Sequence, residues 1–231
     1  MKRIEWAEVD YTGLGSYTAA EAARLLRVHP STLQRWIAGY RYRTTEEVRR
    51  AEPLIVPSFT FGDRIELAFR DLVELKFVKA FIDAGMSTHA VRKCLDVARD
   101  VIGDPRPFAT RRFRTDGRTL FLRVSEGEGD SVLDLRRLQY ELPDLIKQTF
   151  RDLDVEADVV VRWRPYRGRP SIVVDPLRAF GQPIAAVSGV PTTTLAESAA
   201  AEGSAEITAR IFDVPVAVVR EAIHFERSLA A

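Results

Sequence analysis

The sequence has a single cysteine and contains no long hydrophobic run. Because Cys94 stands alone among 231 residues, an internal disulfide is excluded, which fits a reducing cytoplasm. No stretch of 18 apolar residues occurs, and no apolar signal segment opens the chain. We therefore expect a cytoplasmic protein with neither a membrane span nor a signal peptide.

Patterns for the common catalytic and cofactor sites are also missing. The three histidines are widely spaced and form no metal-binding set with Cys94, and there is no Gly-rich phosphate loop and no Ser/His/Asp spacing. One acidic run has carboxylates at alternating positions: Asp152, Asp154, Glu156 and Asp158. On a strand they would share a face, as a metal-dependent nuclease needs, although such runs are more often solvated edges. We expect no enzyme, no cofactor and no metal.

The chain does have a substantial apolar fraction and an even charge balance. Apolar residues make up 46% of the sequence, and 34 Lys and Arg stand against 33 Asp and Glu, for a net charge of +1. This length and composition allow one large globular domain or two to three small ones. Any affinity for nucleic acid must therefore come from local basic patches.

The stretch SYTAAEAARLLRVHPSTLQRWIAGYRYR, residues 16–43, predicts two short helices joined by a turn. Thr18 and Glu21 fit a capping box at the start of the first helix. Its apolar stripe is Ala19, Ala22, Ala23 and Leu26. After the break at residues 28–30, a second helix turns three apolar side chains toward the first: Leu33, Trp36 and Ile37. The pattern indicates a helix-turn-helix, the alternative being a simple helical hairpin with a polar outer face.

The outer face of the second helix and the segment after it are rich in groups that bind DNA. Polar side chains that can reach bases or phosphates lie outward at the front of the helix. Residues 24–50 contain seven arginines against two glutamates, a balance typical of a phosphate-binding face. The predicted DNA-binding residues are Arg27, Ser31, Thr32, Gln34, Arg35, Tyr40, Arg41 and Arg43.

The next segments predict a wing and two core helices. Pro53 and Pro57 bracket an alternating apolar set (Ile55, Val56, Phe59 and Phe61) that indicates one or two short strands, a candidate wing. A long amphipathic helix is expected over residues 63–83, ended by Gly85. A further helix, capped by Ser87 or Thr88, should continue to Gly103.

The order YT..EAARLL.V.P.TLQRWI, a wing-like insert and then DLVELKFVKAFIDAGMSTHAVRKCLD resembles the winged helix-turn-helix domain of MerR-type regulators. The resemblance covers residues 17–102 and implies DNA binding by the positions of Thr32, Gln34, Arg35 and Tyr40. The sequence departs from that family in a longer, more strand-like wing segment. It also lacks the long antiparallel dimerisation helix that follows in the family.

The middle of the chain predicts a small α+β region. Asp116-Gly117 lies between two β-prone runs and is a two-residue hairpin signal. Six arginines in residues 106–123 fit either a soluble edge hairpin or a second phosphate contact. A flexible loop is expected over 125–131, then a helix over 135–153 broken or kinked at Pro143, and then strands in ADVVVRWRPY and SIVVDP.

The C-terminal part begins with strand-like pieces and continues with helices. Two helix patterns follow Thr194, and a second pair with helix-turn-helix spacing begins at Ser204 or Ala205 and is separated at residues 213–215. Its expected core face is Ile207, Ile211, Val218, Val219 and Ile223. Residues 192–231 hold six acids and three arginines, so this pair is expected to pack or bind protein rather than phosphate.

Residues 174–229 contain the motifs DP.RAFGQPI, VPTTTL, AEGSAEITARIFDVP and V.EAI.FE. In these motifs the segment resembles the small helical domain of VapB-type antitoxins that pair with PIN-like ribonuclease toxins. It implies a toxin partner with a positive RNA-binding groove. The candidate apolar anchors for that partner are Phe212, Val216, Val219 and Phe225, although Phe212 fits the core of its own module equally well.

The sequence as a whole predicts a mostly helical α+β protein in three parts. These are a winged helix-turn-helix region (1–103), a central α+β region that could serve dimerisation (104–173), and a small helical domain with a second helix-turn-helix-like pair (174–231). The predicted function is a type II antitoxin that acts as a homodimeric autorepressor on operator DNA and neutralises a PIN-like ribonuclease toxin. The alternative is a MerR-like transcriptional regulator without a toxin partner.

Overall fold

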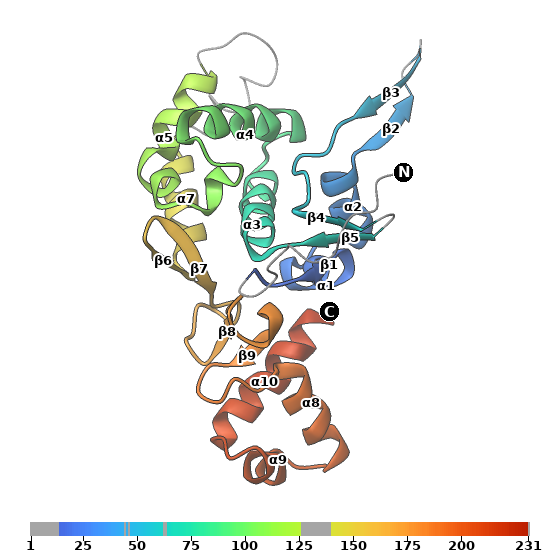
Figure 1. The fold of residues 1–231 in the computed structure, drawn as a ribbon, viewed down its shortest axis with the longest axis vertical. Helices are drawn as coiled ribbons and strands as arrows, with labels where there is room; N and C mark the ends of the chain where they lie inside the picture. Colours follow the sequence, from blue (N-terminus) through green and yellow to red (C-terminus); the bar gives the residue numbers. More distant parts are fainter. Residues whose placement is uncertain (1–13, 44, 46, 62–63, 126–139, 231) are drawn as a thin grey trace.

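The computed structural model describes residues 14–43, 45, 47–61, 64–125 and 140–230, which form a mostly helical α+β structure, as predicted (Figure 1). The helices are α1 (Ala19–Leu26), α2 (Pro30–Ala38), α3 (Phe69–Asp83), α4 (Thr88–Ile102), α5 (Arg111–Ser125), α7 (Leu142–Phe150), α8 (Thr192–Ala201), α9 (Ala205–Ile211) and α10 (Val216–Leu229). The strands are β1 (Tyr17–Thr18), β2 (Tyr40–Arg43), β3 (Val48–Ala51), β4 (Phe59–Phe61), β5 (Arg64–Leu67), β6 (Leu153–Glu156), β7 (Val159–Trp163), β8 (Ile172–Val174) and β9 (Pro183–Ala185).

The strands form small antiparallel sheets that serve different parts of the molecule. Strands β1, β5 and β4 make one sheet beside α1, and β6 to β9 make a second in chain order. Strands β2 and β3 pair with each other alone. In Figure 1 this two-stranded hairpin projects from the body of the protein at the upper right.

The main core is centred on α3 and a cluster of phenylalanine rings. Phe77 and Phe81 of α3 contact rings from three other segments, with centroid separations between 4.8 and 6.3 Å. The partner rings are Phe108, Phe113, Phe121 and Phe150. Such tilted and edge-on contacts add to the hydrophobic gain of burying the rings. This core contains buried residues from Tyr17 to Val174, so the expected regions 1–103 and 104–173 share it.

The C-terminal helices have a smaller core of their own. It contains Ala185, Leu195, Ala199, Ala209, Val214, Val219 and Ala222. The end of α10 is an exception, because Phe225 and Leu229 belong to the main core. Figure 1 accordingly shows the C-terminus beside α1. The last helix therefore joins the C-terminal module to the helix-turn-helix.

The hairpin expected at Asp116-Gly117 is absent, and this segment is helix α5. Its buried side chains, Phe113, Leu120, Phe121 and Val124, follow helical spacing. A Cβ on Gly117 would lie 2.8 Å from Ile146 Cδ1 of α7. The glycine therefore allows two helices to pack closely rather than providing a turn, and the hairpin prediction was wrong.

The helix expected over residues 63–83 begins later, at Phe69. Residues 64–67 form β5 instead, because its backbone pairs with β1 on one side and β4 on the other. Strand β4 was expected to belong to a wing, but it lies in this sheet, and the projecting hairpin is formed earlier in the chain by β2 and β3. The next helix was predicted correctly: Ser87 caps α4 and Gly103 ends it.

The remaining predictions have mixed outcomes. Helix α7 contains Pro143 in its first turn, whereas the expected loop over 125–131 lies mostly outside the described residues. The two central strands and the C-terminal helix pair are present, with Ser204 as the cap of α9. Ile211 was expected in the core but is 56% exposed, because α9 ends there and its buried positions are Thr208 and Ala209.

The acidic run around β6 is engaged in ion pairs. Asp152 accepts a hydrogen bond from Trp163 Nε1 at 2.9 Å and pairs with Lys76 Nζ at 2.9 Å. Asp154 pairs with Arg162 at 3.6 Å and with Arg164 at 3.2 Å. The described residues contain no group of three or more His, Cys, Asp or Glu side chains placed to hold a metal. Asp152 and Asp154 therefore stabilise the central sheet through these contacts.

Candidate nucleic-acid interface

Helices α1 and α2 are joined by a short, well-capped turn. Thr18 and Glu21 form the predicted capping box, with Glu21 N donating to Thr18 Oγ1 at 3.2 Å. Helix α1 ends at Arg27, which has a left-handed φ of 53°. His29 then caps α2, because its Nδ1 accepts a hydrogen bond from Ser31 N at 3.2 Å. This cap was not predicted, since histidine is an uncommon choice at that position.

The two sides of α2 differ sharply in burial. Leu33, Trp36 and Ile37 are buried against the rest of the domain, as expected. Ser31, Gln34 and Arg35 are exposed, and Thr32 is half-buried. A helix of this kind, with its first turns free and polar, can enter a major groove. The structure thus brings together four of the predicted DNA-binding residues.

The basic hairpin, strands β2 and β3, continues this exposed surface. Cross-strand pairing places Arg41 opposite Arg50, and Arg43 opposite Val48. Since directly paired residues share a face, one face of the hairpin carries three guanidinium groups: those of Arg41, Arg43 and Arg50. In the described part of the chain, Arg41 and Arg43 have no carboxylate partner, while Arg50 has a loose 3.8 Å pair with Glu52. Arginines that face each other across the strands repel, and a bound phosphate would relieve this repulsion. This face of the hairpin is therefore suited to phosphate.

The other face of the hairpin is aromatic and lies next to α2. The rings of Tyr40 and Tyr42 are 5.9 Å apart, and the Arg35 guanidinium lies 5.7 Å from the centre of the Tyr40 ring. Gly39 connects α2 to the hairpin with a φ of 70°, and a Cβ there would lie only 2.3 Å from Ala51 O. A side chain at this junction would push the two strands away from the helix.

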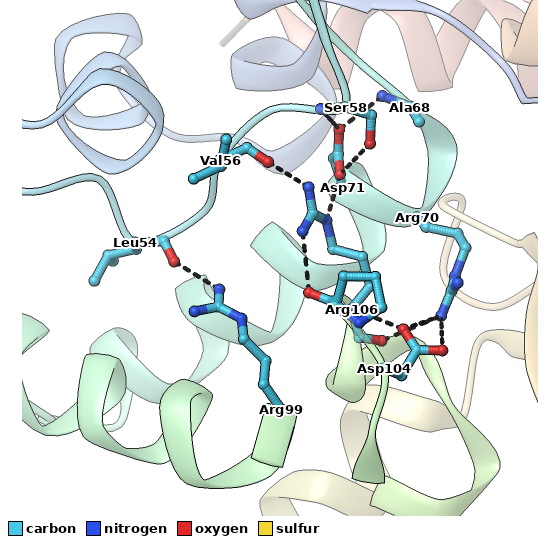
Figure 2. A network of polar contacts seen from close by, with 10 residues as sticks. Leu54, Val56, Ser58, Ala68, Arg70, Asp71, Arg99, Asp104 and Arg106 are labelled. Atoms are coloured by element: carbon cyan, nitrogen blue, oxygen red, sulfur yellow. Dashed lines mark hydrogen bonds and ion pairs between the residues drawn. The ribbon is translucent and has the colours of Figure 1, made fainter.

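A polar network behind the hairpin holds the chain that leaves it (Figure 2). Arg92 donates to Glu52 O and Pro53 O, at 2.6 and 2.8 Å, and Arg99 donates to Leu54 O at 3.0 Å. Arg106 binds Val56 O and the carboxylate of Asp71, which is fully buried. The segment that follows the hairpin is thus fixed to α3 and α4, and it anchors the hairpin to them.

Asp71 is the centre of that network. Its carboxylate also accepts hydrogen bonds from Ser58 N (2.8 Å), Ser58 Oγ (2.9 Å) and Ala68 N (3.0 Å). A second carboxylate, Asp104, binds Arg70 at 2.8 Å and Arg106 N at 2.7 Å. Figure 2 shows these groups converging between α3 and the segment that follows α4. Every formal charge in the network has a partner of opposite sign or a carbonyl.

The exposed start of α4 completes the surface beside the hairpin. Thr88 and His89 line a hollow of about 310 Å³ together with Arg35, Tyr40 and Arg50. The N-terminus of a helix favours phosphate, because its free N–H groups and dipole are positive. The sequence did not indicate that α4 would lie here, since this contact depends on the tertiary fold.

Arg27 is the one predicted DNA-binding residue that lies apart from the others. Its Nη2 donates to Ser228 Oγ of α10 at 2.9 Å. The neighbouring Arg24 pairs with Glu226 at 2.9 Å. Both contacts connect the helix-turn-helix to the C-terminal helix, so Arg27 contributes to that junction.

Comparison with known proteins agrees with this geometry. Residues 15–95, which include α1, α2, the basic hairpin and part of α4, match a family described as "Putative DNA-binding HTH domain". The chain is also 30% identical over 188 residues to "Putative antitoxin VapB45" of Mycobacterium tuberculosis (strain ATCC 25618 / H37Rv), which covers 75% of this chain and 78% of that protein. The chain belongs to the VapB45 family.

The fold of the family is shared with a crystal structure. Rv2018 from Mycobacterium tuberculosis superposes with a TM-score of 0.68 at 23% sequence identity, covering 90% of this chain and 96% of the other. The similarity therefore extends through the central sheet and the C-terminal helices, well beyond the helix-turn-helix. None of the helices in the described ranges is both long and apolar enough to cross a bilayer.

The four candidate anchors for a protein partner lie in different environments. Val219 and Phe225 are completely buried, Val219 in the C-terminal core and Phe225 in the main core against Tyr166. Phe212 and Val216 are half-buried, and the adjacent Ile211 is exposed. The structure therefore leaves the end of α9 and the start of α10 as the accessible apolar surface of this helix pair.

Proposed function

We propose that this chain is the antitoxin of a type II toxin–antitoxin pair. In this role it binds operator DNA as a homodimer, represses its own transcription and neutralises a PIN-like ribonuclease toxin. The observation that carries the proposal is the match to "Putative antitoxin VapB45" over three quarters of the chain. It is combined with a basic surface on a helix-turn-helix, where Arg41 and Arg43 have no ion-pair partner among the described residues. The MerR-like order of elements supports a winged mode of binding, with α2 in the major groove and the basic hairpin on the flanking backbone.

Recognition of a palindromic operator would require a two-fold symmetric homodimer. A single helix-turn-helix reads half of a palindromic site, so repression requires two copies at a fixed spacing. Light scattering on the purified protein should give twice the mass of one chain, and a monomer at every concentration would contradict this part of the proposal.

The C-terminal module offers an acidic surface for the toxin. Glu197, Glu202 and Asp213 are exposed and have no cationic partner among the described residues. A ribonuclease carries a positive groove for its RNA, so these carboxylates would provide attraction, while Ile211 and Phe212, next to Asp213, would provide apolar contact. Glu206 and Glu221 contribute less, because each is already paired with an arginine.

DNA binding is tested by fluorescence anisotropy with the region upstream of the gene. Affinity should fall steeply with salt, with a slope near −0.9 in log K against log [salt] for each phosphate neutralised. Arg35→Ala should cost about 1–3 kcal/mol of specific binding if the guanidinium reaches a base. Absence of binding even at low salt would contradict the proposal.

Toxin neutralisation is tested by co-expression with the product of a neighbouring PIN-like gene. Glu202→Lys/Asp213→Lys should weaken capture and restore RNase activity, whereas the control Asp100→Lys/Asp116→Lys reverses two exposed carboxylates on α4 and α5 and should not. Deletion of residues 192–231 is a poorer test, because it removes Phe225 and Leu229 from the main core. Equal neutralisation by both double variants would contradict the proposal that the acidic surface binds the toxin.

A regulator without a toxin is the second candidate. It is favoured by the complete burial of Val219 and Phe225, which assigns half of the expected anchors to internal packing. In that case the C-terminal module serves assembly only. Operator binding without any neighbouring protein that co-purifies would support this alternative.

A further inference from the structure

A cavity of about 910 Å³ lies where the helix-turn-helix, the central sheet and the last helix meet. Its walls carry four arginines from three segments: Arg27 after α1, Arg151 after α7, and Arg164 and Arg167 after β7. His224 and Ser228 of α10 line the side formed by the C-terminal module. The cavity shares no residue with the hollow beside the basic hairpin.

The positive charge of this cavity is largely uncompensated. The one carboxylate in its wall, that of Asp152, is already held by Lys76 and Trp163. Arg164 is paired with Asp154 at 3.2 Å, outside the cavity wall.

Among the described residues, the other three arginines have no anionic partner. Arg27 has only the neutral hydroxyl of Ser228, and Arg151 and Arg167 have no carboxylate partner in the described ranges. Converging guanidinium groups repel one another unless an anion lies between them.

The number of guanidinium groups in the wall favours an anion that carries several negative charges, such as a polyphosphate. A guanidinium forms two parallel hydrogen bonds with phosphate oxygens, and several of them around one site can bind more than one phosphate. The side wall also contains the ring of Tyr166, which the Arg167 guanidinium covers at 5.6 Å. Because this ring is only 8% exposed and also packs against Phe225, it supports Arg167 in the wall rather than contacting the ligand.

The shape favours a small ligand over duplex DNA. The volume lies within the range of small-molecule sites, about 300–1,000 Å³. The arginines of the wall come from the turn after α1, from the end of α7 and from the loop after β7, so three separate segments contribute cationic side chains. A duplex would present only one face of its backbone to such a hollow.

We propose that this cavity binds a small ligand with two or more phosphate groups, such as a nucleoside triphosphate. The ligand would contact Arg27 of the helix-turn-helix together with Arg151 and Arg167 of the central region. The site is independent of the toxin proposal, because none of these residues belongs to the acidic surface.

The test is isothermal titration of the full-length protein with ATP and, separately, with inorganic tripolyphosphate. We expect wild type to bind both and Arg151→Ala/Arg167→Ala to bind each at least tenfold more weakly. Both side chains are exposed, so the fold should survive, which thermal melting would verify. The control Arg114→Ala/Arg118→Ala removes the same charge from exposed positions of α5 and should bind as wild type does.

Three outcomes would overturn the proposal. Wild type that binds neither ligand excludes the site. Equal weakening by both double variants would show attraction by overall charge alone. If Arg151→Ala/Arg167→Ala weakens binding of operator DNA while wild type ignores ATP and tripolyphosphate, the arginines contact the DNA backbone instead. Measuring operator DNA binding also distinguishes this site from the basic hairpin, because the hairpin arginines are unchanged in every variant.

Discussion

The basic hairpin and the network behind it are both rich in arginine, and they use it differently. In the network, Arg92, Arg99 and Arg106 bind backbone carbonyls of the chain leaving the hairpin, and Arg106 also binds the buried Asp71. In the hairpin, Arg41 and Arg43 project into solvent, and Arg41 faces Arg50 across the strands. The guanidinium groups of the first set are held by carbonyl and carboxylate oxygens of the protein, whereas those of the second are available for a partner.

This contrast shows that pairing, rather than the number of arginines, distinguishes structural from binding groups. Residues 24–50 and 106–123 hold seven and six arginines, respectively. The first range forms the candidate DNA surface, whereas Arg106 in the second is a structural anchor and most of the others lie on helix α5. Removing a paired arginine or its partner should affect stability, whereas removing an arginine of the basic hairpin that has no ion-pair partner among the described residues should affect DNA binding.

Asp71→Ala is the strongest way to break the network. The change leaves the Arg106 guanidinium, which is 11% exposed, without its counter-ion and removes three further hydrogen bonds. Loss of one partner of a buried pair costs about 3–5 kcal/mol. Urea unfolding followed by circular dichroism should show this loss. Asp104→Ala is the matched control: its carboxylate is more exposed, at 24%, and we expect a smaller loss, so equal losses would contradict the central role of Asp71.

Glu74→Gln tests a buried carboxyl of α3 that forms no ion pair among the described residues. Burial raises the pKa of Glu74 to about 8, despite the attraction of the Arg106 and Arg99 guanidiniums. Between the ordinary carboxyl pKa and this value, the folded state holds a proton that the unfolded state has lost. The wild-type free energy of unfolding should therefore fall by about 1.4 kcal/mol per pH unit from roughly pH 5 to 8.

The glutamine variant has no proton to lose at this position. Its stability relative to wild type should therefore rise with pH across the same range, as urea unfolding at a series of pH values would show. Glu197→Gln, at an exposed position of α8, is the control and should remain parallel to wild type. A constant difference between Glu74→Gln and wild type would mean that Glu74 titrates normally.

Local patterns in the sequence predicted much of the candidate site. The capping box at Thr18, the inward Leu33, Trp36 and Ile37, and the outward polar positions of α2 all depend on residues close in the chain, and the structure places them as expected. The hairpin itself was misplaced by about ten residues. Its strand YRYR alternates tyrosine with arginine, but all four residues are exposed and none is aliphatic, so the hydrophobic signal pointed to the later β4.

The rest depends on contacts between segments far apart in the sequence. Gly117 looked like a turn residue until Ile146 of α7 was known to lie against it, and residues 64–67 became a strand because β1 and β4 flank them. Arg27 faces Ser228, 201 residues away, rather than joining the basic surface. No periodicity within a segment can indicate such pairs.

The double variant Arg41→Ala/Arg43→Ala should weaken DNA binding by the hairpin without lowering the stability of the protein. Because neither side chain has an ion-pair partner in the described residues, the free energy of unfolding should stay within about 0.5 kcal/mol of wild type. If each guanidinium neutralises one phosphate, the slope of log K against log [salt] for operator DNA should become less steep by about 2. Anisotropy titrations between low and moderate salt measure that slope.

The control for the hairpin is Arg114→Ala/Arg118→Ala, which removes the same charge from exposed positions of α5. It should leave the salt slope as in wild type, because the charge of a distant helix is screened beyond about 10 Å at 0.1 M salt. A slope that changes equally in both variants would mean that overall charge, and not contact by the hairpin, sets the affinity. An unchanged slope in Arg41→Ala/Arg43→Ala would remove the hairpin from the DNA interface and leave α2 and the start of α4 as its contacts.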